Sequence, residues 1–236
     1  MESKIAIKEL RTMNLEGGYL IDGFPSVGFS SVIATESMIQ TSQFQLAGII
    51  DSDAFPPISL IKDGKPNFPT RIFVNDELKV AAFLSHLVIE ESFHRSIARE
   101  MLEWAKNKKI SLIVSSLSIK STNSDEIIAV GSTEKAMQKI KDSGLKTLKN
   151  GTVPGIPGML LNEGRLSQQD VIVILFHSDG TSPDFRSSAK LCMTISQLIP
   201  GTSCDIQSLQ QEAEKVENMI KKDLEEARYL KDSMYR

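Results

Sequence analysis

The sequence predicts an α/β fold in which a mixed β-sheet carries helices on both faces. Short apolar runs rich in Ile and Val alternate with longer segments of helical periodicity, which is typical of a largely buried sheet. The length of 236 residues, with 41% hydrophobic and 24% charged residues, is that of a globular protein with a sizeable core. We expect one α/β core domain over residues 1–204, followed by a long C-terminal helix and tail over residues 205–236.

The first half of the chain predicts a strand, a helix and then a close series of strands. Residues 17–24 (GGYLIDGF) form the first strand, and residues 25–40 a loop and a helix. Turn signals such as Asp63-Gly64 separate the strands that follow. Because no helix fits between these strands, this part of the sheet should be antiparallel. The strands of this series are residues 44–51, 58–64, 70–76 and 78–86.

The second half returns to alternating helices and strands. An amphipathic helix is expected from Glu90 to Lys108, because its apolar residues recur at helical spacing. Residues 170–178 (DVIVILFHS) are the strongest buried-strand candidate, and the helix after them has Ser182 as N-cap and Pro183 at its first position. The elements between are a strand at 110–117, a polar loop at 120–125, a strand at 126–132 and a helix to about residue 143.

The C-terminal segment has a different pattern. From Ile206 to Met234 its apolar residues step by three or four, with charges such as Glu217 and Lys221 at i,i+4 on the outside. At 1.5 Å per residue the helix would be roughly 40 Å long, more than the core of such a domain needs. We expect part of it to pack on another subunit or to project outward. The alternative is a helix that lies along its own domain.

Charge and cysteine content exclude several classes of protein. The net charge of -3 gives no general attraction to nucleic acid, and the basic run at 106–109 is interpreted as complementing a helix C-terminus. No apolar stretch is long enough to span a membrane. Cys192 and Cys204 are too few for a disulfide framework and form no C-x-x-C pair. We therefore expect a cytoplasmic protein in a reducing compartment, with no nucleic-acid or membrane partner.

The segment GFPSVGFSS, residues 23–31, follows a strand and opens a helix, where α/β proteins often bind ligands. It matches neither G-x-G-x-x-G nor the P-loop, so no nucleotide cofactor is predicted. As a nucleophile elbow, Ser26 lacks the glycine required at the position of Phe24. The favoured interpretation is that Ser26 caps the following helix.

Three further groups have a functional and a structural interpretation. His86, Glu90 and His94 could share one helix face as metal ligands, if the helix already includes His86, but a solvated face is favoured and no metal is expected. His177 with Asp179 at a strand end is a stronger enzyme candidate, although polar residues also simply resume there. The glycine-rich residues 150–165 could line a concave site or pass close to a neighbour, and both interpretations stay open.

The order of these segments is similar to that of the proteasome assembly chaperone two family in its archaeal branch. The resemblance rests on GFPSVGFSSVIATESMIQ, FPPISL, GTVPGIPGMLL before an apolar strand, and LQQEAEKVE in the last helix. It implies a single α/β domain similar to nucleoside phosphorylases, without known catalysis, which forms homo-oligomers and helps proteasome core particles to assemble. The prolines Pro154 and Pro157 depart from the family's usual version of that loop, which puts any small-molecule role inferred for the loop in question.

The last three residues, Met234, Tyr235 and Arg236, resemble the hydrophobic-tyrosine-any tripeptide that proteasome activators dock between α-ring subunits. Such a tail can offer an apolar side chain, a stiff ring with a hydroxyl and a terminal carboxylate. We therefore expect a non-enzymatic chaperone or ATP-independent activator that binds the 20S α-ring through this tail. The alternatives are a nucleoside hydrolase or phosphorylase-like enzyme, a small-molecule-binding protein, and a scaffold in which the last helix only builds the oligomer.

Overall fold

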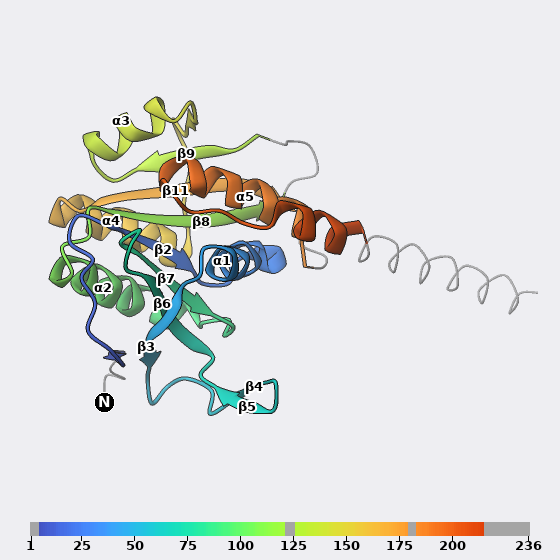
Figure 1. Cartoon of the computed structure of the whole chain (residues 1–236). Helices are drawn as coiled ribbons and strands as arrows, with labels where there is room; N and C mark the ends of the chain where they lie inside the picture. Colours follow the sequence, from blue (N-terminus) through green and yellow to red (C-terminus); the bar gives the residue numbers. More distant parts are fainter. Residues whose placement is uncertain (1–4, 121–125, 179–182, 215–236) are drawn as a thin grey trace, which may run out of the picture.

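The computed structural model describes residues 5–120, 126–178 and 183–214 (Figure 1). The strands are β1 (Ala6–Glu9), β2 (Tyr19–Gly23), β3 (Gln45–Asp51), β4 (Leu60–Lys62), β5 (Lys65–Asn67), β6 (Thr70–Asn75), β7 (Val80–Ser85), β8 (Leu112–Lys120), β9 (Ile128–Gly131), β10 (Lys146–Thr147) and β11 (Asp170–Ser178). The helices are the 3₁₀ turn η1 (Val27–Phe29), α1 (Ser30–Thr41), α2 (Glu91–Asn107), α3 (Glu134–Asp142), α4 (Gly155–Ser167) and α5 (Phe185–Leu198). Residues 206–214 are also helical.

The main sheet is mixed, as the sequence predicts. Within the described residues it has nine strands in the order β1-β3-β6-β7-β2-β8-β11-β9-β10. β7, β2, β8 and β11 run parallel at its centre. The strands β3, β6 and β7 pair antiparallel, which confirms the prediction made from their close spacing. The apolar centre of the sheet therefore coincides with the longest Ile and Val runs of the sequence.

One member of the predicted strand series is not part of this sheet. β4 pairs only with β5, in a separate hairpin whose turn is the predicted Asp63-Gly64. Both turn residues have positive φ, 51° at Asp63 and 72° at Gly64, as a tight hairpin turn requires. β5 contains Pro66, which has no N–H to donate to a further ladder. The assignment of residues 58–64 to the main series is thus wrong.

Helices cover both faces of the sheet, so the expected three-layer arrangement is confirmed (Figure 1). α2 and α4 pack on one face in a cluster that includes Leu20, Ile113 and Val173, while α1, α3 and α5 pack on the other. The ring of Trp104 on α2 meets Phe83 of β7 edge-on at 5.0 Å, and its Nε1–H donates to Glu9 at 2.9 Å. The indole thus buries its ring and still satisfies its donor.

The start of α5 differs from the prediction. The helix begins at Phe185, and Asp184 is its N-cap, with a carboxylate oxygen that accepts the N–H of Ser187 at 2.9 Å. The other carboxylate oxygen accepts Ser178 Oγ at 2.8 Å, which ties the cap to the end of β11. The prediction of Ser182 as N-cap and Pro183 at the first helical position is wrong, because the side chain of Asp184 caps the helix two residues later. Ser182 itself lies outside the described residues.

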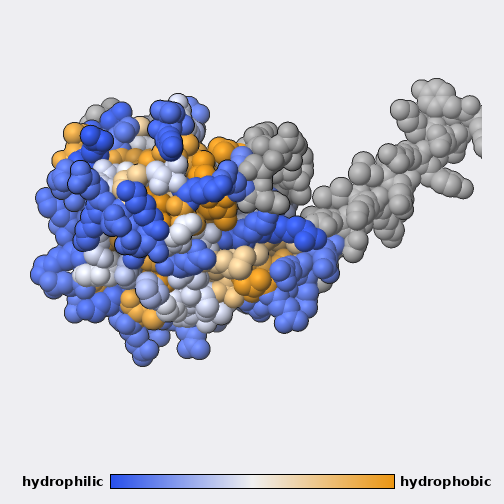
Figure 2. All heavy atoms as spheres, turned by 90° about the horizontal axis from the view of Figure 1, so that it is seen from above, coloured by the Kyte–Doolittle hydropathy of each residue, from blue (hydrophilic) through white to orange (hydrophobic). Residues whose placement is uncertain are grey.

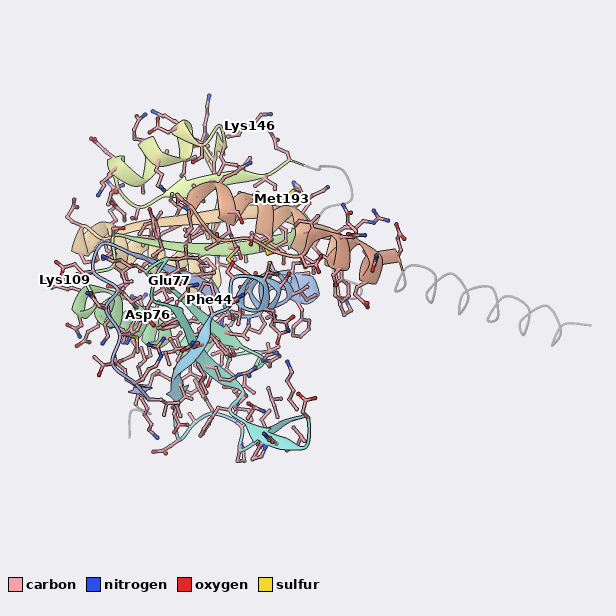
Figure 3. The ribbon with its side chains drawn as sticks, in the orientation of Figure 1. Phe44, Asp76, Glu77, Lys109, Lys146 and Met193 are labelled. Carbon is pink, nitrogen blue, oxygen red and sulfur yellow. A yellow bond between two sulfur atoms is a disulfide. The ribbon has the colours of Figure 1, made fainter. Side chains whose placement is uncertain are left out.

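The root of the C-terminal helix is attached to the core. Cys192, buried on α5, forms a disulfide with Cys204, and the sticks of Figure 3 show such sulfur bonds in yellow. Because the chain has few cysteines, the sequence favoured a reducing compartment and therefore did not predict this disulfide. Ser203 N–H also donates to Ser42 Oγ at 3.0 Å. Two hydrophobic residues of the first turns, Leu209 and Ala213, are buried.

Of the two interpretations of the C-terminal helix, the one in which it lies along its own domain holds for its described part. Residues 206–214 lie along their own domain, because their apolar positions are covered by it. Residues 215–236, with the tripeptide Met234, Tyr235 and Arg236, lie outside the described residues. The division of the chain into residues 1–204 and 205–236 stays a prediction.

The two ends of the parallel strands differ in character. Figure 3 shows Asp76, Glu77 and Lys109 at the amino edge of the sheet, in the turns that precede β7 and β8. From the α3 side, the surface is mostly hydrophilic with apolar residues showing between the charged ones (Figure 2).

Among the described residues, no helix combines the length and apolar character that crossing a membrane requires.

Candidate functional site at the carboxyl edge of the sheet

A cavity of about 570 Å³ opens where β2 ends, beside Ser116 and Leu117 of β8. Its walls come from the loop after β2, residues 24–29, from the beginning of α2 and from the beginning of α4. The two segments whose roles the sequence left open, residues 23–31 and 150–165, therefore meet in one place. Ligand sites of α/β proteins usually lie at this edge of the sheet.

Tight backbone turns bring these segments together. In the loop after β2, Gly28 has φ 71° and Phe29 has φ 53°, so the chain reverses before α1 begins. At the start of α4, a Cβ on Gly158 would lie 1.9 Å from the carbonyl oxygen of Val153. Only glycine permits that approach, which packs the first turn of α4 against the segment before it. Of the two interpretations of residues 150–165, the structure shows both a close backbone approach and a concave wall.

Asp22, the last side chain of β2, is a buried acid that lines this cavity. Its Oδ1 accepts the N–H of Phe24 at 3.1 Å, and its Oδ2 accepts Ser115 Oγ at 2.6 Å. Burial raises the pKa of Asp22 to about 6, although both hydrogen bonds and the nearby His94 act in the opposite direction. Desolvation thus outweighs its hydrogen bonds. Perturbed carboxyls in a cavity are candidates for functional groups.

A chain of three serine hydroxyls lies beside Asp22. Ser26 Oγ and Ser31 Oγ are 2.8 Å apart, and Ser31 Oγ and Ser116 Oγ are also 2.8 Å apart. Ser26 stands at the N-cap position of η1, but its side chain makes no cap hydrogen bond. The prediction that Ser26 caps the following helix is therefore wrong, because its hydroxyl bonds to Ser31 instead. Ser26 and Ser116 both line the cavity.

The predicted histidine cluster is divided between two places. α2 begins at Glu91, so His86 is not part of this helix, and the condition for a shared metal face is not met. His86 Nε2 lies 3.2 Å from Glu36 Oε1, a contact that lowers the pKa of Glu36. His94 lines the cavity, and its Nε2 donates to the carbonyl of Ile89 at 3.1 Å. Within the described part of the chain, no group of acidic, His and Cys side chains is arranged to hold a metal ion.

His177 does not join this site. It lies near the end of β11, partly buried, and is not among the described residues that line the cavity. Its ring Nδ1 is buried and has no hydrogen-bond partner among the described residues. Asp179, its expected partner, lies outside the described residues. The pairing that supported an enzyme is thus not shown.

Sequence reasoning missed the acid of this site. Asp22 is a single charged residue in the apolar strand YLIDGF, directly before Gly23. Burying a carboxyl in a central strand costs stability. Its position at the end of the strand, where α/β proteins place their sites, was the available signal. The sequence indicated His94 only as a candidate metal ligand.

The comparisons with known proteins bear on the whole of this architecture. A search of curated proteins finds no match. The model of the PAC2 family matches residues 20–224. The chain belongs to the PAC2 family. The resemblance stated from the sequence motifs is thereby confirmed, and the matched range includes residues 23–31 and 150–165 and the described part of the last helix.

Solved structures share the fold of this PAC2 protein. PbaA of Pyrococcus furiosus, described as an archaeal homolog of proteasome-assembly chaperone, aligns with a TM-score of 0.85 and 24% identity over 98% of this chain and 96% of that one. PbaB of the same organism, described as an archaeal proteasome activator, aligns with a TM-score of 0.80 and 17% identity over 93% and 98%. A protein of unknown function from Thermoplasma acidophilum gives 0.73 and 19% over 96% and 93%. At these identities the similarity shows the fold, while the likeness to nucleoside phosphorylases stays a prediction.

Proposed function

We propose that this PAC2 protein is a cytoplasmic proteasome assembly chaperone or ATP-independent activator. The observation that carries the proposal is membership of the PAC2 family over residues 20–224. The fold shared with a proteasome-assembly chaperone homolog and with a proteasome activator supports it. We propose no catalytic role, since the described residues do not unite His177 with a partner in the cavity.

The proposed contact with the 20S α-ring is the tail Met234, Tyr235 and Arg236. Met234 would fill an adaptable apolar cleft, Tyr235 would add a stiff ring and a hydroxyl, and the carboxylate after Arg236 would pair with a lysine ammonium. The described part of the helix supports this role, because its root is held by the burial of Leu209 and Ala213 against the core. A fixed root limits the space in which the tail must find its cleft, which lowers the ordering cost of docking.

A homo-oligomer would make such a short contact effective. Several tails that bind one ring together can exceed the affinity of a single tail by roughly a hundredfold or more. Exposed apolar side chains on and beside the β4–β5 hairpin support self-association, since single chains rarely leave such a group uncovered. These residues are Ile58, Ile61 and Phe68.

The test is a binding assay against the isolated 20S core particle. Deleting Met234 to Arg236, or changing Tyr235→Ala, should abolish co-sedimentation with the core particle. Tyr235→Phe keeps the ring and should bind about fivefold more weakly than the unchanged protein, as for the loss of one hydrogen bond. Adding Gly-Ser after Arg236 moves the carboxylate and should also abolish binding.

Tyr229→Ala is the matched control, because it removes the other tyrosine of the same segment. It should bind like the unchanged protein. Light scattering should give the same multiple of the 26.1 kDa chain for every variant. Equal binding by the full-length protein and the deletion variant would refute docking through the tail. A measured mass of a single chain for the full-length protein would refute the oligomer.

A further inference from the structure

The cavity at the carboxyl edge has the dimensions of a small-ligand site. Its volume of about 570 Å³ lies within the range of roughly 300–1,000 Å³ that such sites occupy. Most of its wall is apolar, with Phe24, Leu117 and Ile156 contributed by three different segments. Its polar groups are few and stand close together, which is how ligand sites fix the orientation of what they bind.

The charge of the lining indicates the charge of the ligand. Asp22 and Glu91 supply carboxyl groups, and among the described lining residues there is no Lys or Arg. The N-termini of α2 and α4 contribute partial positive charge. However, the carboxyl of Glu91 already stands in the first turn of α2. An anionic ligand would meet these acids with no Lys or Arg among the described lining residues to offset them, so a neutral or cationic ligand is favoured.

The hydrogen-bonding capacity that remains is mostly that of an acceptor. A carboxylate has about four lone-pair positions, and Asp22 receives hydrogen bonds from Phe24 N–H and Ser115 Oγ. Because His94 Nε2–H donates to the Ile89 carbonyl, Nδ1 of the neutral ring is an acceptor. A ligand with N–H groups can therefore be bound by both side chains.

The hydroxyl chain adds one donor. Ser26, Ser31 and Ser116 have three hydroxyl protons, and two of them are used in the two contacts of the chain. When Ser31 donates to one end of the chain, the proton that is left lies at the other end, at Ser26 or at Ser116, both of which line the cavity. The site thus offers a donor for one acceptor atom of a ligand.

We propose that this cavity binds a small, flat ring compound that carries a cationic nitrogen group, whose N–H groups face the Asp22 carboxyl. The ring lies between the walls formed by Phe24, Leu117 and Ile156, and the hydroxyl chain donates to a ring nitrogen or carbonyl. A donor placed on Asp22 also offsets the desolvation of its charge, which burial makes costly. This proposal is independent of the tail and of the proteasome.

The experiment uses the full chain and two aromatic probes of similar size, benzamidine and benzoate, with inorganic phosphate as a third. Benzamidine at about ten times its Kd should raise Tm by about 3 °C or more. Benzoate and phosphate should leave Tm unchanged. Asp22→Asn should weaken benzamidine binding at least about tenfold in calorimetry, because it replaces an acceptor by an amide.

A second variant keeps the test valid if Asp22→Asn does not fold. Val88 lines the mouth of the cavity and is 74% exposed, so Val88→Trp should fold normally and obstruct the mouth. The Val88→Trp variant should show no rise in Tm with benzamidine. Leu166→Trp is the matched control, since Leu166 is 81% exposed and does not line the cavity.

Three results would overturn the proposal. A shift with benzoate or phosphate but not with benzamidine would show an anion site. No shift with any probe would show that the cavity binds none of these chemical classes. Equal benzamidine binding by the unchanged protein and by Val88→Trp would place the bound molecule elsewhere. None of these results depends on whether the tail binds a core particle.

Discussion

At the amino edge of the sheet polar groups pair with one another at the surface, whereas at the carboxyl edge Asp22 is buried beside an apolar cavity. Lys109 Nζ lies 3.0 Å from Glu16 Oε1, and Arg11 Nη2 lies 2.7 Å from Asp76 Oδ2. The hollow at the amino edge, about 290 Å³, has Lys135 and Asp170 in its lining, and these two charges also pair.

The difference between the two edges shows which polar groups the fold itself explains and which it does not. The surface charges of the amino edge are paired and contribute little to stability. They need no explanation beyond the turns in which they lie. A buried carboxyl with raised pKa costs stability and is not needed to end a strand. The carboxyl edge therefore carries the candidate site. Three predictions test this contrast.

The largest effect is expected at a glycine of the amino edge. A Cβ on Gly18 would lie 2.0 Å from the Lys79 carbonyl oxygen, whereas one on Gly17 meets nothing within 4 Å. Gly18→Ala must push β2 away from the turn before β7, so it should lower the free energy of unfolding by about 3 kcal/mol or more. Gly17→Ala, at φ 76°, should lower it by only about 1 kcal/mol. Urea denaturation measures both, and similar losses would contradict the close approach.

The second effect concerns the pH dependence of stability. The pKa of Asp22 is about 6 in the folded protein and 3.8 ordinarily. The protonated acid therefore stabilises the fold below pH 3.8, and this contribution is lost as pH rises through 6. Between about pH 4 and pH 8 the loss should be about 2 to 3 kcal/mol. Asp22→Asn should lack it and be more stable than the unchanged protein at the higher pH.

The comparison between the two proteins isolates Asp22 from other acids. Glu36 and Asp51 have lowered pKa values, so their contributions are lost as pH falls, which is the opposite direction. Both groups are present in both proteins, as are His94 and Glu91, which line the cavity with Asp22. If the free energies of unfolding of the unchanged protein and of Asp22→Asn change in parallel with pH, burial does not raise the pKa of Asp22.

The smallest effect is expected for a surface ion pair of the amino edge. The side chains of Glu16 and Lys109 are 62% and 67% exposed. Glu16→Gln should lower the free energy of unfolding by about 0.2 to 1 kcal/mol, and added salt should reduce the difference further. Denaturation at two salt concentrations measures this. A loss as large as that of Gly18→Ala would mean that the amino edge also depends on charge.

The fold was more predictable than the site. Strand β11 begins and ends where the sequence predicts, at 170 and 178, because a long apolar run has no other role in an α/β fold. The β4–β5 hairpin was misplaced, since an apolar run does not show which sheet it joins. The cap of α5 was misplaced because Ser182 and Asp184 are both good capping residues.

The cavity could not be read from the sequence because it depends on distant segments. Asp22, Ser116 and Gly155 are brought together only by the strand order and by two helix N-termini. The 150–165 loop and the 23–31 segment were each recognised as unusual, but periodicity gives no distance between them. A local pattern predicts elements, whereas a site of this kind is a property of the topology.

The single tryptophan of the chain gives the protein a built-in optical reporter. Trp104 is packed against Phe83 near the end of α2, while Glu91 at the start of the same helix borders the cavity. Thirteen residues of helix separate the two, about 20 Å. Intrinsic fluorescence will therefore follow the melting of this helical layer, and it also reports on the cavity side of β2, because Phe83, on which the indole packs, is the ladder partner of Asp22.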